Sequence, residues 1–197
     1  INKTYKVYFY RDGEVKDYIL QRVNTYVFKN PVEVMNNIIS VTEYIRAKIK
    51  ATGVTAKRNV LHYHKTQDGA YYFIDEKNDF WRCSRFIDDS TTFLIASPFV
   101  MEESGKAFGE FQKYLADYPV KNLFIAIPHF HNTPMRFETF RKSAEADAAG
   151  RAAEVRREIE EYLALEEKAT ETYRLQRAGV LPLRVTHNDT KLSLIHI

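Results

Sequence analysis

Thr4 to Asn24 is the stretch that decides the fold of the first part of the chain. It consists of three consecutive segments: Thr4-Tyr5-Lys6-Val7-Tyr8-Phe9-Tyr10, then Arg11-Asp12-Gly13-Glu14, then Val15 to Asn24. In the first and third segments, the side chains alternate between two faces with a period of two residues, which is typical of half-buried β-strands. The Asp-Gly pair between them is among the stronger signals for a hairpin. We therefore expect the chain to open with an antiparallel pair of strands.

The residues after this hairpin predict a helix and then further strands. Pro31 stands near the first turn of a segment, 32–50, in which apolar residues recur at spacings of three and four, as in an amphipathic helix. Strands are predicted over 59–65, 70–75 and 79–87, the last rich in aromatic residues. This order is the α+β pattern of a small lobe with a helix packed on one side of an antiparallel sheet.

The composition becomes helical after the polar break at residues 88–90. Apolar periodicity predicts helices over 101–118, 137–149 and 151–178, followed by a short strand and a loop. We expect an amino-terminal lobe at 1–87, a hinge or linker at 88–97, and a partial helical lobe at 98–197.

Composition limits the class of protein. The chain has 197 residues, 45% of them hydrophobic, which suits one or two globular domains. The net charge of +3 arises from interleaved acidic and basic residues and does not favour nucleic acid as a partner. The single cysteine, Cys83, excludes an internal disulfide, and no signal peptide or long apolar run is present, so we expect a cytoplasmic protein without a membrane partner.

A His-x-Asp-x-Lys cluster, formed by His187, Asp189 and Lys191, follows a short apolar run near the end of the chain. Phosphoryl transfer needs a carboxylate beside the substrate hydroxyl and a cation to balance the charge of the transferred group. Asp189 and Lys191 fit these two roles. The alternatives are an exposed loop acid and an ordinary surface lysine.

Several spaced motifs, in order and covering the chain from Ile1 to about Ser193, carry a resemblance to a known family. They are Ile1-Asn2-Lys3-Thr4-Tyr5, Tyr18-Ile19-Leu20-Gln21-Arg22-Val23-Asn24, Phe28, Pro31, Asn37-Ile38, Trp81-Arg82, Phe130-His131 and Thr186-His187-Asn188-Asp189-Thr190-Lys191. Together they resemble the aminoglycoside phosphotransferase superfamily, and within it the branch of N-acetylhexosamine 1-kinases. The resemblance implies a protein-kinase-like two-lobe fold, ATP, Mg²⁺, and phosphorylation of a sugar, at the anomeric hydroxyl of an N-acetylhexosamine. Homoserine, choline and aminoglycosides are acceptors of other members and stay open.

The resemblance also implies roles for individual residues. Asp189 matches the catalytic aspartate that orients or deprotonates the acceptor hydroxyl, and Lys191 matches the loop lysine by role, while His187 braces the loop. Asn2, Lys3 and Thr4 match the end of the phosphate-covering loop, and Asn2 and Thr4 are the candidate nucleotide contacts. The segment from Phe86 to Asp88 matches the hinge, where adenine meets backbone groups.

Two positions depart from the kinase pattern. Kinases hold the α- and β-phosphates with a strand lysine that pairs with a glutamate on the next helix. Here the strand offers Gln21 or Arg22, and the helix offers Asn37 or Glu43. Arg22 supplies the positive charge and is the preferred candidate, although Gln21 stands where the superfamily more often has its cation.

The two ends of the chain are read as those of a truncated fragment. The glycine-containing half of the phosphate loop would precede Ile1, and Leu194 stands where a metal-binding asparagine is expected. Metal ligands are therefore expected downstream of the present end. The parent protein is expected to be a kinase, whereas this chain is expected to be an inactive fragment.

Two further features contain residue types that occur in metal or catalytic sites. The pairs His62/His64 and His129/His131 have a spacing that can begin a metal site, but two ligands do not complete one. Cys83 is expected to be a small core residue, because no spacing identifies a base for it.

Overall fold

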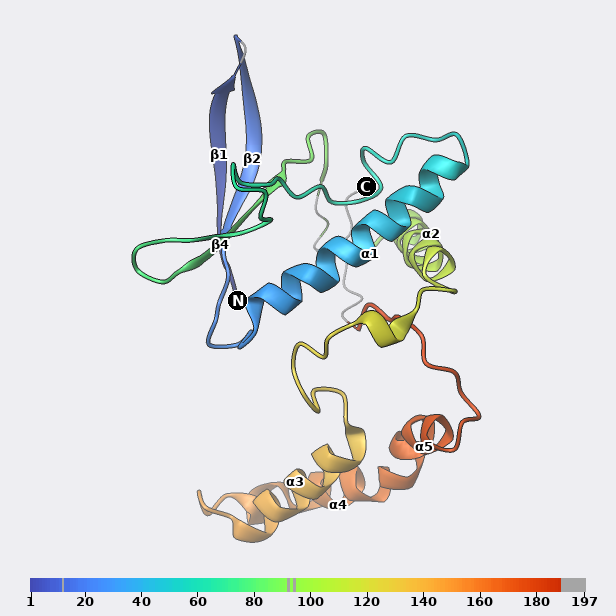
Figure 1. Ribbon diagram of the computed structural model, residues 1–197. Coiled ribbons are helices and arrows are strands. Elements are labelled where there is room, and N and C mark those ends of the chain that lie inside the picture. The colour runs from blue at the N-terminus through green and yellow to red at the C-terminus, as the bar shows by residue number, and fades with distance from the viewer. Residues whose placement is uncertain (12, 92, 94, 189–197) are drawn as a thin grey trace. The chain divides into compact units, whose positions relative to one another are not determined.

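The computed structural model describes residues 1–11, 13–91, 93 and 95–188 (Figure 1). The chain forms two compact units, one made of Ile1–Ala126 with the segment that begins at Arg184, and the other of Ile127–Leu183. The first unit contains a four-stranded antiparallel sheet, and helices occur in both units. The predicted α+β class is therefore confirmed, while the division into 1–87, 88–97 and 98–197 stays a prediction.

The opening hairpin forms as predicted. Strand β1 (Lys3–Arg11) pairs antiparallel with β2 (Glu14–Arg22), and Arg11 faces Glu14 beside the turn. Gly13 has a φ of +83°, a conformation that side chains with a Cβ rarely adopt. A glycine at this position therefore suits the tight turn between the two strands.

Strand β4 (Phe80–Arg85) pairs with the other edge of β2, and the short β3 (Phe73–Ile74) pairs with β4. The sheet order is β1-β2-β4-β3. The strand predicted over 70–75 is therefore reduced to two residues.

The strand predicted over 59–65 is wrong, because only the bridge between Tyr63 and Ser84 forms there. The chain touches β4 through two backbone bonds of 2.9 Å, on either side of that bridge. It then leaves the edge in a turn that the backbone N–H of Thr66 closes on the carbonyl of Ala70.

Helix α1 (Pro31–Ala51) begins with a proline, whose missing N–H costs nothing in a first turn. Its amino-terminal half packs on one face of the sheet, where Val23, Met35, Tyr63 and Phe80 are buried together. We call this the α1 face. Figure 1 shows α1 running from the sheet toward α2.

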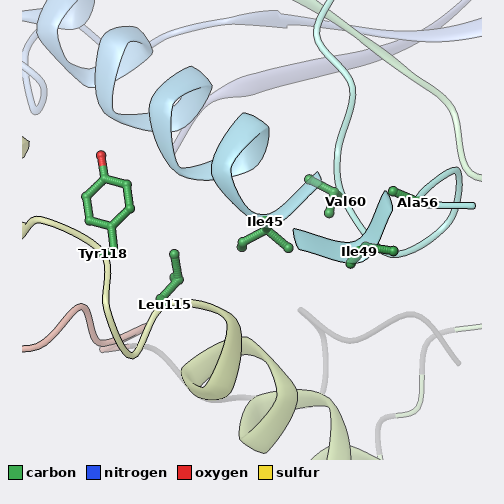
Figure 2. Packing of buried hydrophobic residues seen from close by; sticks show 6 residues of the cluster. All are labelled: Ile45, Ile49, Ala56, Val60, Leu115 and Tyr118. Atoms are coloured by element: carbon green, nitrogen blue, oxygen red, sulfur yellow. The ribbon is translucent and has the colours of Figure 1, made fainter. Parts of the chain in front are cut away.

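The carboxyl-terminal half of α1 belongs to a second cluster, shown in Figure 2. Its members come from α1, the loop after it and the residues that follow the next helix, and they are Ile45, Ile49, Ala56, Val60, Leu115 and Tyr118. Helix α2 spans Pro98–Tyr114, and a 3₁₀ turn, η1, follows at Val120–Asn122. The apolar pattern predicts a helix that continues to residue 118, but Leu115 caps the helix and is only 1% exposed.

The second unit is helical. Helix α3 (Thr133–Ala146) ends at Asp147, which has a φ of +37°. The single helix predicted over 151–178 is wrong. It consists of the 3₁₀ turn η2 (Ala152–Val155), α4 (Arg156–Ala164) and α5 (Glu166–Arg177), with Leu165 at the break. An ion pair between Arg141 and Glu166 links α3 to α5 across this break.

Candidate functional site

Gln21 and Arg22 are neighbours in β2, so their side chains lie on opposite faces of the sheet. Arg22 lies opposite Trp81 in the register and forms an ion pair of 2.6 Å with Asp79. Asp79 holds the pKa of Arg22 above its usual value, mainly by this hydrogen bond. Arg22 is thus engaged on the face away from α1.

Gln21 lies on the α1 face, within a row of polar side chains that crosses three strands. It is directly opposite Thr4 of β1 and Arg82 of β4. Its Nε2 donates to Thr4 Oγ1 at 3.0 Å, and its Oε1 accepts from Arg82 Nε at 3.0 Å. We call Thr4, Gln21 and Arg82 the polar row.

Arg82 is the charged member of the polar row and is half-buried. Its Nη1 approaches the sulfur of Met35 on α1 at 3.6 Å, and its guanidinium carbon lies 5.4 Å from the centre of the Tyr63 ring. Within the described part of the chain, no carboxylate lies within 4.0 Å of Arg82. The polar row therefore carries a positive charge without a bound counter-ion from those residues.

The other predicted nucleotide contacts lie at two places around the sheet. The side-chain oxygen of Asn2 accepts a 3.0 Å hydrogen bond from the backbone of Asn24 and so ties the two ends of the hairpin together. The ammonium nitrogen of Lys6 lies 4.1 Å from the centre of the Phe86 ring. Lys6 is itself neutralised by Asp17 at 2.7 Å, which raises the pKa of the lysine.

Asp88 lines an open pocket of about 660 Å³ with Phe86, at the end of the sheet. Cationic and imidazole side chains share this pocket, namely Lys16, His62, His64 and Arg85. The segment predicted as a hinge thus borders a polar cavity.

Neither helix residue considered as a partner for the strand cation contacts it. Asn37 exchanges two hydrogen bonds with the backbone of Phe124, at 2.7 Å and 2.9 Å. Glu43 forms an ion pair with Arg46 on the next turn of α1. The ion pair between strand and helix that is typical of kinases is not formed by these side chains.

The segment that leads to the predicted catalytic cluster packs on α2. The ring of His187 lies edge-on to Phe108 and Phe111, with centres 5.3 Å and 5.6 Å away. Val185 packs against the cluster of Figure 2, and the guanidinium of Arg184 donates to the carbonyl of Ala116. Residues 184–188 therefore return to the unit that carries the sheet. Asp189 and Lys191 lie outside the described residues.

An open pocket of about 430 Å³ lies beside His187. Its walls come from α1, α2 and the loop before β3, with Ile87 of the predicted hinge as a further wall. Arg58 and Glu110 are its charged members. Ile87 of the predicted hinge and His187 of the segment before Asp189 therefore line the same cavity.

The imidazoles of His62 and His64 lie edge-on, with centres 4.8 Å apart. Burial, and then nearby positive charge, lowers the pKa of both. In the part of the chain that the structure describes, no group of three His, Cys, Asp or Glu side chains is placed to hold a metal. Cys83, predicted as a small core residue, is only partly buried. Burial raises the pKa of its thiol.

Arg82 is not among the candidate binding residues predicted from the sequence, although it belongs to the Trp81-Arg82 motif. The sequence alone could not identify it, because the face on which Arg82 lies depends on strand register. In the structure, Phe80 and Ser84 of β4 are buried on the α1 face, so Arg82 between them also points toward α1. A cation at such a position calls for a partner.

No protein-family model matches the chain. Among the described helices, none has an apolar stretch able to cross a bilayer.

Proposed function

We propose that this chain carries the nucleotide-binding part of an ATP-dependent small-molecule kinase with a two-lobe, protein-kinase-like fold. The reaction proposed is phosphoryl transfer to a sugar hydroxyl, with the anomeric hydroxyl of an N-acetylhexosamine as acceptor. The observation that supports it most is that the polar row and residues 184–188 belong to one compact unit, although more than half of the chain separates them in sequence.

The chemistry of phosphoryl transfer suggests a role for the polar row and another for residues 184–188. Catalysis of this step consists almost entirely of positioning and electrostatic stabilisation. On this proposal the polar row supplies donors for the phosphate chain, and the segment from Phe86 to Asp88 meets adenine. Packing of His187 on α2 anchors the residues that precede Asp189, so that the loop is held at its start.

Asp189 would orient or deprotonate the acceptor hydroxyl, and Lys191 would balance the charge on the transferred group. Mg²⁺, which the resemblance implies, would enter with the nucleotide. The described residues do not fit a metal site, because they offer no group of three ligating side chains. We therefore assign no step to the metal.

Two measurements on the purified chain test the proposal. The first is calorimetric titration with ATP in the presence of Mg²⁺, with adenosine as the reference ligand. The second is transfer of labelled phosphate from ATP to a panel of N-acetylglucosamine, N-acetylgalactosamine, homoserine, choline and kanamycin, with Asp189→Asn as the matched control.

Each outcome has a distinct meaning. ATP binding with transfer to an N-acetylhexosamine, lost in Asp189→Asn, is the result expected of the complete reaction, and transfer to another acceptor would correct the substrate class. ATP binding without transfer would reduce the function to nucleotide binding. Absence of both binding and transfer would refute the proposal.

A further inference from the structure

Arg82 is a half-buried guanidinium that points to the α1 face and has no carboxylate partner among the described residues. We propose that Arg82, positioned by Gln21 and Thr4, binds the phosphate chain of the nucleotide. This inference rests on the proposed function and deepens it, because it names the cation that the kinase pattern leaves open.

The location of Arg22 argues against the candidate preferred from the sequence. Arg22 lies on the opposite face, where Asp79 already satisfies its charge at 2.6 Å. Its neighbours there are aromatic, with Trp81 opposite it in the register and the rings of Tyr5 and Trp81 6.1 Å apart. A phosphate bound by Arg22 would have to displace a carboxylate, whereas one bound by Arg82 would not.

The polar row holds Arg82 in a defined orientation before any ligand arrives. Gln21 Oε1 accepts a hydrogen bond from Nε of the guanidinium, and Gln21 Nε2 donates one to Thr4 Oγ1. Among the residues that the structure describes, only the Met35 sulfur accepts a contact from Nη1, at 3.6 Å. Because guanidinium N–H groups match the geometry of phosphate oxygens, the remaining donors are suited to this ligand.

Lys6 is the other strand cation on this face, but it differs from Arg82 in its partners. Asp17 lies 2.7 Å from its ammonium, and the ring of Phe86 lies beneath it. Lys6 is therefore charge-balanced within the protein. Of these two strand cations, Arg82 is the one without a carboxylate partner among the described residues.

The test compares ATP, adenosine and inorganic tripolyphosphate as ligands of the wild-type chain and of three variants. Arg82→Gln removes the charge. Gln21→Glu keeps the size of the side chain but places a carboxylate against Arg82 Nε, which occupies the guanidinium without removing it. Arg22→Gln makes the same change as Arg82→Gln on the opposite face. Circular dichroism and the fluorescence of the single tryptophan check that each variant is folded.

We expect Arg82→Gln and Gln21→Glu each to weaken binding of ATP and of tripolyphosphate by roughly 10- to 100-fold, the range for a lost charge-assisted contact. Adenosine binding should change by less than about twofold, because it lacks phosphate. Arg22→Gln should leave all three affinities within about twofold. The Gln21→Glu arm keeps the test decisive if Arg82→Gln fails to fold.

Failure of this inference can be told from failure of the proposed function. If the wild type binds ATP more tightly than adenosine and both variants bind it equally well, the assignment of Arg82 is wrong and the nucleotide site stands. A large loss in Arg22→Gln alone would return the role to Arg22. If the wild type binds tripolyphosphate but gains nothing from the nucleoside, the anion site stands without the kinase. If it binds none of the ligands, both are wrong.

Discussion

Ile49 offers the most direct test of the core that joins α1 to α2. It is 2% exposed and packs in the cluster of Figure 2, whereas Ile95 of the same unit is 86% exposed. Ile49→Val and Ile49→Ala remove increasing amounts of buried side chain, and Ile95→Ala makes the same truncation in water. The three variants therefore separate the effect of burial from the effect of the substitution.

Burial sets the expected size of the effect. At about 0.8 kcal/mol for each buried carbon group, Ile49→Val should lower the free energy of unfolding by about 1 kcal/mol. Ile49→Ala loses about 2.5 kcal/mol by the same measure, and the cavity that remains brings the loss to about 3 to 4 kcal/mol. The better helix propensity of alanine returns only a few tenths of a kcal/mol. Ile95→Ala should stay within about 0.5 kcal/mol of the wild type.

Urea unfolding followed by tryptophan fluorescence measures these differences, because Trp81 is the only tryptophan and lies in the sheet of this unit. With a slope of about 2 kcal/mol per molar urea, Ile49→Ala should lower the midpoint by roughly 1.5 M. Equal midpoints for Ile49→Ala and Ile95→Ala would refute the reasoning, since the cluster would then contribute nothing to stability.

Three further predictions concern single contacts. Ser40 Oγ lies 2.6 Å from Tyr118 Oη, so a double-mutant cycle of Ser40→Ala and Tyr118→Phe should give a coupling free energy of about 1 kcal/mol, and additive effects would contradict the bond. Asn37→Ala should speed hydrogen exchange of the Phe124 amide, which donates to Asn37 at 2.9 Å, and unchanged protection in exchange spectra would count against this. Burial holds the pKa of His64 below its unfolded value of 6.5. As the pH falls, the unfolded state therefore takes up a proton at His64 before the folded state does, and the free energy of unfolding should decrease below about pH 6.5. His64→Gln should flatten the dependence between about pH 6.5 and 5, as measured by urea midpoints, and an unchanged slope would show that other groups cause it.

The elements with a strong local signal were predictable from the sequence. The hairpin follows from its alternation and its Asp-Gly turn, and α1 from its apolar spacing and Pro31. The end of α2 could not be predicted, because Tyr118 continues the apolar pattern while Leu115 already turns the chain. Local periodicity cannot distinguish a residue that continues a helix from one that packs after its end.

The break between α4 and α5 had no local signal either. Neither glycine nor proline stands near Leu165, and the charged pattern reads as one helix through it. The break places Glu166 where Arg141 of α3 can pair with it, a contact between residues far apart in sequence. Tertiary contacts of this kind override local propensity.

The candidate site was predictable in part. The sequence pointed to Thr4 and Gln21, which the structure places in one hydrogen-bonded row, but it could not say which neighbouring cation joins them. That choice depends on strand register, since a shift of one residue would exchange the faces of Arg82 and Trp81. The pairing of β2 with β4 joins residues far apart in sequence, such as Gln21 and Arg82 with a separation of 61, and no local pattern records it.

The return of residues 184–188 to the first unit has a consequence for synthesis on the ribosome. Val185 joins a cluster whose other members, such as Ile49 and Leu115, are made much earlier. At translation rates of about 5 to 20 residues per second, on the order of ten seconds pass between synthesis of the residues that form this apolar surface and synthesis of Val185. During that interval the nascent chain presents this surface to chaperones and to other nascent chains, so slow stretches of translation between residues 127 and 183 would lengthen the period in which it can aggregate.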